Sequence, residues 1–139
     1  MILIDTTPLV ALCDPRDDLH RRALRDLARV KLEPVVVCEP ILTEACFLLP
    51  HAVQRQRLFR LLCELPIRDF TGEPGSVWPA VFNWLEKYAD HEPDWADASL
   101  VTLASQTKAA KVWTYDTEFW TTWRGPDGKR IPLLVDPRK

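Results

Sequence analysis

The sequence predicts an α/β domain of three layers, with helices on both faces of a mostly parallel central sheet. Short apolar runs rich in β-branched and aromatic residues lie far apart in the chain, and amphipathic helical periods fill the intervals between them. Buried strands that alternate with helices are typical of parallel sheets. The length of 139 residues suits one core. We therefore predict a single domain over residues 1–139.

Four short apolar runs fit buried strands. The first, Ile2-Leu3-Ile4, is followed at once by an acid, and the second is the uniform run Val35-Val36-Val37. Residues 112–115 and 131–135 complete the predicted set. These runs lie far apart in the sequence and helical periods separate them, so a mostly parallel sheet is expected.

Helical periods fill the intervals between these runs. The first, over residues 19–30, follows Asp17 and Asp18, which are candidate N-caps. Further helices are expected over residues 41–49, 58–65, 78–88 and 96–103.

The net charge of −2 argues against a protein that coats nucleic acid without specificity, because that binding depends on Lys and Arg neutralising phosphates. A local basic rim is still available in two places, each of which also fits an ordinary solvated helix face. The first rim runs over residues 20–25 and on to Arg29 and Lys31, and the second consists of Arg55, Arg57 and Arg60. The four glycines form neither of the glycine-rich phosphate loops, which removes the best sequence support for nucleotide-cofactor chemistry.

The chain begins without a basic stretch ahead of its first apolar run, and no apolar segment approaches the roughly 20 residues of a membrane span. We therefore expect a cytoplasmic protein that does not enter a membrane. The four cysteines, at 13, 38, 46 and 63, are expected to be buried free thiols, and the three histidines, at 20, 51 and 91, to be surface residues. About half of the six tryptophans are expected in the core, and the others at interfaces.

Two aspartates stand where predicted strands end. Asp5 follows residues 2–4, and Asp116 follows residues 112–115. Open parallel sheets bind their ligands beyond the carboxyl ends of the strands, so both acids are candidate ligands. Each also fits an N-cap, because a helix-like segment follows it. For either aspartate alone, the two interpretations are equally favoured.

Glu44 lies within residues 41–49, a segment so apolar that we expect its helix to be almost fully buried. A buried carboxylate has to be protonated, paired with a cation or bound to a metal. No Lys or Arg lies within one helical turn of Glu44, which favours the metal over a local ion pair.

Asp94 and Asp97 stand three residues apart at the start of a predicted helix and therefore share one face of its first turn. Asp94 fits the N-cap. Asp97 lies on the same side as the apolar Leu100, Val101 and Ala104, where a solvated charge is not expected. Asp5, Glu44, Asp97 and Asp116 are called the acidic quartet below. Packed together, these carboxylates would repel one another unless a divalent cation neutralised them, and an all-oxygen site suits Mg²⁺, Mn²⁺ or Ca²⁺ better than Zn²⁺.

With these residues in place, the chain resembles the PIN-domain family, and among its members the VapC toxin ribonucleases of bacterial toxin–antitoxin pairs. Asp5-Thr6-Thr7 after the first strand resembles the family's opening motif, and residues 41–45 resemble its buried helix with one Glu. Residues 94–104 resemble the family's most distinctive stretch, and residues 112–116 resemble the strand that brings the last acid. The four motifs occur in the family's order and span the chain.

The resemblance implies that the acidic quartet binds Mg²⁺ or Mn²⁺ and hydrolyses RNA phosphodiester bonds in line, leaving a 5′-phosphate and a 3′-hydroxyl. Thr6 and Thr114 would lie near the metal or the scissile phosphate, and Asp94 would be an outer acid. Where many relatives carry a basic residue and Asp ahead of the residue matching Phe119, this chain has Thr117 and Glu118, which makes Glu118 a further candidate. A homodimer and an antitoxin protein partner are also implied.

Two other functions compete with this one. A PIN-like protein used only for binding would keep the fold without cleavage, although all four acids are present. Phosphoryl transfer through an aspartyl phosphate at Asp5 would require a second aspartate at position 7, where this chain has Thr7.

Overall fold

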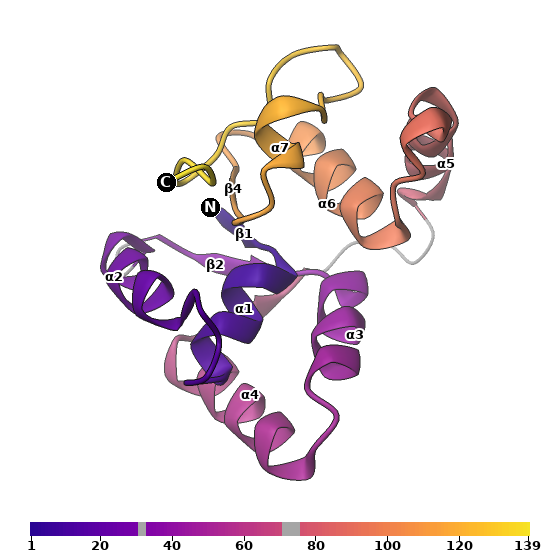
Figure 1. The fold of residues 1–139 in the computed structure, drawn as a ribbon. Helices are drawn as coiled ribbons and strands as arrows, with labels where there is room; N and C mark the ends of the chain where they lie inside the picture. The colour runs from indigo at the N-terminus through magenta and orange to yellow at the C-terminus, as the bar shows by residue number, and fades with distance from the viewer. Residues whose placement is uncertain (31–32, 71–75) are drawn as a thin grey trace.

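The computed structural model describes residues 1–30, 33–70 and 76–139, and helices surround a small central sheet (Figure 1). Lys31, which the sequence adds to the first basic rim, lies outside these residues. The elements follow the chain in the order β1 (Ile2–Ile4), α1 (Thr6–Cys13), α2 (His20–Val30), β2 (Val35–Val37), α3 (Glu39–Leu48), α4 (Ala52–Glu64), β3 (Arg68–Asp69), α5 (Trp78–Lys87), the 3₁₀ turn η1 (Ala89–His91), α6 (Trp95–Gln106), β4 (Lys111–Trp113) and α7 (Glu118–Thr121).

The sheet has the strand order β3-β2-β1-β4, and all of its strands are parallel, which confirms the predicted class. Leu3 of β1 stands opposite Val36 on one side and Val112 on the other. The side chains of β1 and β2 are buried on both faces of the sheet, and Ile2, Leu3 and Ile4 expose at most 1% of their surface. This burial is the reason that the strands are continuous apolar runs without alternation.

The connections place helices on both sides of the sheet. The chain passes from β1 to β2 through α1 and α2, and from β2 to β3 through α3 and α4, always moving toward the same edge. It then returns across the whole sheet through α5 and α6 to reach β4. Right-handed crossovers in opposite directions cover opposite faces, and α5 and α6 accordingly lie away from α1, α2 and α4 (Figure 1). This is the predicted arrangement of three layers.

The structure contains fewer strand residues near the C-terminus than predicted. The predicted strand 131–135 is reduced to one bridge between Leu133 and Val112, because Pro132 has no N–H to donate to a ladder. β4 stops at Trp113, two residues early, since the Tyr115 N–H donates to the hydroxyl of Thr7 instead of to a strand. The helices predicted over 19–30, 41–49, 58–65, 78–88 and 96–103 are all present, with α4 beginning six residues earlier than predicted, at Ala52.

Strand β3 was not predicted, and α1 and α7 were anticipated only as the helix-like segments after Asp5 and Asp116, without predicted bounds. In α1 six of its eight residues are buried, so the segment has no polar face and no visible amphipathic period. β3 has only two residues, and both are exposed. α7 is a single turn of four residues.

The prediction that residues 41–49 form an almost fully buried helix is wrong. Only Ile41 and Ala45 of α3 are buried, because α3 packs against α1 and α6 along one side. Phe47 is 80% exposed and Leu48 is 51% exposed. Three aromatic side chains from α5 and α6 are also exposed in the described structure, and we call the five residues together the apolar patch: Phe47, Leu48, Trp78, Phe82 and Trp95.

The cysteines are all free, as predicted, but they are not all buried. Cys13 and Cys38 are buried, and burial raises the pKa of each thiol to about 11, which makes them unreactive. Cys46 is half-buried, and the prediction is wrong for Cys63, which is exposed because α4 buries only Leu58 fully.

The predicted surface position is confirmed for two of the three histidines, and the predicted core position for half of the tryptophans. His51 and His91 are exposed, whereas His20 is half-buried, with its Nδ1 2.6 Å from the carbonyl oxygen of Ala11. Three of the six tryptophans are buried, namely Trp84, Trp113 and Trp123. None of the helices in the described ranges is both long and apolar enough to cross a membrane.

Candidate metal centre

The carboxyl ends of β1 and β4 meet at the point where the connections diverge. These strands are neighbours, yet the chain leaves β1 toward one face of the sheet and reaches β4 from the other face. Such a switch point leaves a crevice beyond the strand ends, where open α/β sheets bind ligands. Asp5 and Asp116 follow these two strands.

Asp5 is held in one orientation by two hydrogen bonds. It is 5% exposed; its Oδ1 accepts the Thr6 N–H at 2.7 Å, and its Oδ2 accepts the Thr114 hydroxyl at 2.6 Å. The first bond makes Asp5 the N-cap of α1, as one of its two interpretations predicted. The second bond links β1 to the segment after β4, so the cap does not exclude a ligand role.

Asp116 is tied to the same network. The Thr114 hydroxyl oxygen accepts the Asp116 N–H at 3.0 Å while it donates to Asp5. The Asp116 Oδ1 accepts the Glu118 N–H at 2.9 Å, which leaves Oδ2 with no hydrogen-bond partner in the described structure. The Thr114 hydroxyl therefore links the side chain of Asp5 to the backbone of Asp116.

Thr7 has a positioning role that the sequence analysis missed. Its hydroxyl oxygen accepts the Tyr115 N–H at 2.9 Å and so anchors the segment that carries Asp116 to the first turn of α1. A threonine in a first turn gives no signal of a partner more than 100 residues away, so only the fold reveals this contact.

Asp94 and Asp97 reach the same edge through the N-terminus of α6. Asp94 is the N-cap of this helix, since its Oδ1 accepts the Asp97 N–H at 2.7 Å, and this confirms the predicted cap. α6 runs toward the start of β4, which leaves its first turn at the carboxyl edge of the sheet. Asp97 is only partly exposed there, in agreement with its apolar side in the sequence.

Glu44 comes from α3, which packs against both α1 and α6. Its carboxylate is partly buried rather than fully buried as predicted. Burial raises the pKa of Glu44, and the negative charge of Asp94 raises it further, while the Thr6 hydroxyl partly offsets both.

Burial and the neighbouring carboxylates raise the pKa of Asp5 and of Asp97. Burial raises the pKa of Asp5 to about 7, against the hydrogen bonds from Thr114 and Thr6, and the charges of Glu44 and Asp116 add to the increase. Burial also raises the pKa of Asp97 to about 8, with further contributions from Asp94, Asp5, Asp116 and Glu44. The folded chain thus brings the whole predicted quartet and Asp94 within electrostatic range of one another.

No positive side chain in the described part of the chain pairs with this cluster. Within residues 1–30, 33–70 and 76–139, none of these five acids forms an ion pair with Lys, Arg or His. The Thr6 hydroxyl is buried and makes no well-formed hydrogen bond in the same residues. Unpaired oxygen donors at one place fit a hard divalent cation.

The described residues do not form a closed cage, however. No three Asp, Glu, His or Cys side chains among them converge closely enough to enclose an ion. The Glu118 side chain is exposed on α7, and Glu118 contacts the cluster only through its backbone N–H, which donates to Asp116, among the described contacts. Its predicted role stays a prediction.

Comparison with solved structures supports this architecture. The sarcin–ricin-loop-cleaving toxin VapC20 of Mycobacterium tuberculosis superposes with a TM-score of 0.73 at 21% identity, covering 87% of this chain and 94% of that one. FitAcB from Neisseria gonorrhoeae gives a TM-score of 0.57 at 21% identity, covering 84% of this chain and 88% of that one. None of the functionally curated proteins compared with the chain matches it significantly. The model of the PIN domain matches residues 2–122, and the chain therefore belongs to the PIN-domain family.

Proposed function

We propose that this protein is a metal-dependent endoribonuclease that acts as the toxin of a toxin–antitoxin pair. The observation that carries the proposal is the cluster of unpaired, partly buried carboxylates at the switch point of the sheet. Membership of the PIN-domain family supports nuclease activity, and VapC20, which is similar in fold, is a sarcin–ricin-loop-cleaving toxin. RNA is therefore the proposed substrate.

Asp5, Glu44, Asp97 and Asp116 would hold Mg²⁺ or Mn²⁺. The chemistry of the donors fits either ion, because all are carboxylate oxygens and none carries a counter-charge in the described structure. Such an ion, when bound, supplies Lewis acidity toward a phosphoryl oxygen and a nucleophilic hydroxide at neutral pH. The absence of a closed cage is consistent with ligand side chains that adjust on binding.

The remaining residues of the site position these acids. Thr114 fixes the rotamer of Asp5 and the backbone of Asp116 through one hydroxyl group. The Thr6 hydroxyl lowers the pKa of Glu44 without making a well-formed hydrogen bond in the described residues, and it would donate to a phosphoryl oxygen of a bound substrate. Asp94 orders the first turn of α6, on which Asp97 lies, and its Oδ2 faces no cation in the described residues.

Cleavage of a labelled single-stranded RNA by purified protein tests this proposal. Mg²⁺ or Mn²⁺ should support cleavage, EDTA should stop it, and Asp5→Asn should reduce it strongly. Asp90→Asn, which removes one charge from an exposed position in η1, is the matched control and should cleave normally. RNA binding without metal-dependent cleavage would instead favour the alternative of a PIN-like protein used only for binding.

The proposed partners are an antitoxin protein and a second copy of this chain. The apolar patch supports the second copy, because exposed aromatic side chains clustered on one side are typical of protein interfaces. Light scattering of Phe47→Glu tests this proposal, with Phe59→Glu on α4 as the control. Phe59 is 70% exposed but lies outside the patch. A dimer that survives Phe47→Glu and dissociates with Phe59→Glu would place the interface elsewhere.

A further inference from the structure

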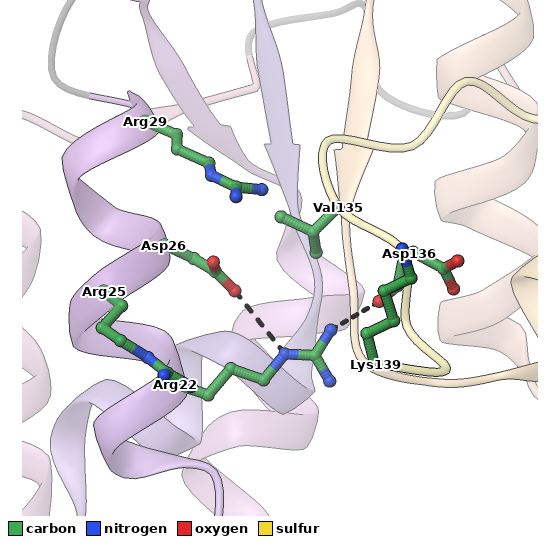
Figure 2. A pocket seen from close by; sticks show the side chains of 7 residues that line it. All are labelled: Arg22, Arg25, Asp26, Arg29, Val135, Asp136 and Lys139. Carbon is green, nitrogen blue, oxygen red and sulfur yellow. Dashed lines mark hydrogen bonds and ion pairs between the residues drawn. The ribbon is translucent and has the colours of Figure 1, made fainter.

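We propose that a basic hollow between α2 and residues 135–139 binds phosphate groups of the RNA, outside the acidic site; this inference rests on the proposed ribonuclease function. The hollow encloses about 400 Å³. Its cationic lining comes from Arg22, Arg25 and Arg29 of α2 and from Lys139, as Figure 2 shows.

The spacing of the arginines places them along one side of the helix. Positions 22, 25 and 29 are separated by three and four residues, so their side chains follow one face of α2. In Figure 2, Arg22 and Arg29 extend from α2 toward Val135 and the last segment of the chain. The first basic rim in the sequence is thus, in part, one wall of a hollow rather than an evenly solvated face.

Arg22 lines the hollow and already contacts other residues of the protein. Its Nη2 donates to the carbonyl oxygen of Asp136 at 2.5 Å, and its Nε lies 3.7 Å from Oδ2 of Asp26. Its guanidinium also lies over the ring of Tyr115, 4.5 Å from the centroid. Arg22 therefore ties the last segment of the chain to α2.

Both acids of the hollow have internal partners. Asp26 accepts the Tyr115 hydroxyl at 2.9 Å in addition to its contact with Arg22, and Asp136 forms an ion pair with Arg138 at 2.7 Å. By contrast, Arg25, Arg29 and Lys139 make no ion pair with any residue that the structure describes. Three cations therefore line the hollow without a counter-charge, in a chain whose net charge is −2.

The chemistry of the lining favours phosphate over a peptide. Peptide interfaces depend on apolar or aromatic anchors buried in a pocket, and the apolar residue that lines this hollow, Val135, is itself buried. Phosphates need only Arg and Lys, which position a nucleic acid without reading its bases. Unpaired cations that line a polar hollow meet that need.

The position relative to the acidic site favours RNA as the source of the phosphate. Tyr115, which packs under Arg22 and donates to Asp26, stands between Thr114 and Asp116 in the chain. Thr114 in turn donates to Asp5. Tyr115 of the hollow's network is thus a direct neighbour in the chain of Thr114 and Asp116 in the carboxylate network. One RNA strand would therefore contact both.

The test compares two double variants that remove the same charge from α2 and the segment before it. Arg25→Gln with Arg29→Gln changes the hollow, whereas Arg16→Gln with Arg21→Gln changes two exposed arginines that do not line it. Both are made in an Asp5→Asn background so that the RNA stays intact. Fluorescence anisotropy measures the affinity for a labelled single-stranded RNA in Mg²⁺ over a series of salt concentrations.

Loss of two phosphate contacts should reduce the slope of log affinity against log salt by about 1.4, because each contact to a single strand contributes about 0.7. The Arg16 and Arg21 variant should lose less than half of that. Arg25→Lys with Arg29→Lys keeps the charges and should keep the slope, and circular dichroism melting should show that every variant folds.

Equal slopes in both Gln variants would overturn the proposal, since only the total charge would then matter. An unchanged slope in the Arg25 and Arg29 variant would also overturn it. A Glu-rich peptide is titrated in parallel. The proposal is also overturned if the Arg25 and Arg29 variant loses affinity for this peptide but keeps its affinity for RNA, because the hollow would then serve a protein. If wild-type protein cleaves RNA while the slope is unchanged, this inference alone fails; if it neither binds nor cleaves RNA, the proposed function fails with it.

Discussion

Asp5 and Asp26 are both buried aspartates, 5% and 8% exposed, yet their surroundings are opposite. Asp5 lies among other acids and pairs with no cation of the described residues, and burial raises its pKa to about 7. Asp26 lies beside Arg22 and accepts a hydroxyl hydrogen bond from Tyr115. Burial alone therefore does not mark a functional acid. The informative feature is a buried charge that the protein leaves without a partner.

The same contrast extends to the two regions around these residues. At the carboxyl edge of the sheet the acids outnumber their partners, and at the α2 hollow the cations do. A chain of net charge −2 has therefore separated its charges instead of pairing them all. Unpaired charges of opposite sign in two adjoining networks suit the proposed RNA substrate. Its phosphates would meet a metal ion held by the acids at one place and the Arg and Lys side chains at the other.

The largest expected difference between the two aspartates is in activity. Asp5→Asn should reduce RNA cleavage by about 10³-fold, because loss of a metal ligand removes several kcal/mol of transition-state stabilisation and each 1.36 kcal/mol is tenfold. Asp26→Asn should change cleavage by less than about tenfold. Single-turnover cleavage at saturating Mg²⁺ measures both. Similar losses in the two variants would end the distinction.

The next expected effect is on the pH dependence of stability without metal. Asp5 and Asp97 have folded pKa values of about 7 and about 8, above the value of 3.8 in the unfolded chain. The folded state then binds more protons between these values, so its free energy of unfolding should fall as pH rises from about 4 to about 8. Each group contributes at most about 1.4 kcal/mol per pH unit, with less from Asp97, which is partly open to solvent.

Denaturant unfolding in EDTA across this pH range measures the effect. Asp5→Asn should have a shallower slope, since its side chain does not titrate. Saturating Mg²⁺ should restore stability most at the higher pH, because metal binding needs ionised carboxylates. Stability that rises with pH in EDTA, or a slope that Asp5→Asn leaves unchanged, would contradict the arrangement of carboxylates described above.

A smaller effect is expected on the free energy of unfolding at neutral pH, and its sign should differ between the Asp26→Asn and Asp5→Asn variants. Asp26→Asn weakens a hydrogen bond to a charged group and an ion pair, and should reduce the free energy of unfolding by about 1.5 to 3 kcal/mol. Asp5→Asn in EDTA should leave it unchanged or raise it, because an unpaired buried charge is removed. Parallel urea titrations decide the matter. Destabilisation by Asp5→Asn as large as that by Asp26→Asn would show that both acids are structural.

The smallest expected effect concerns Asp94, which caps α6 beside the acids. Asp94→Ala should lose about 1 kcal/mol of stability, and Asp94→Ser should lose little, because serine keeps an acceptor for the Asp97 N–H. If the carboxylate also supports the metal ligands, both variants should lose about 10-fold to 100-fold in cleavage. Melting and turnover measured on both separate the two roles. Full activity in Asp94→Ser would limit Asp94 to the cap.

Much of this architecture follows from the sequence alone. The buried runs at Ile2-Leu3-Ile4 and Val35-Val36-Val37 required strands covered on both faces, and the periods between them required helices, because apolar periodicity reports burial directly. The acids at the strand ends were identifiable for the same reason, since a carboxylate that interrupts an apolar pattern needs an explanation. Asp94 was recognisable as a cap from its place ahead of a helical period.

Other features depended on tertiary contacts. The hydrogen bonds from Thr7 to Tyr115 and from Thr114 to Asp5 join residues more than 100 positions apart, and local patterns hold no information about such pairs. The exposure of Phe47 was decided by which neighbours cover α3, and not by the hydropathy of the segment. The arginines of α2 follow one helix face in any sequence reading, but they form a hollow only because residues 135–139 fold back against that face.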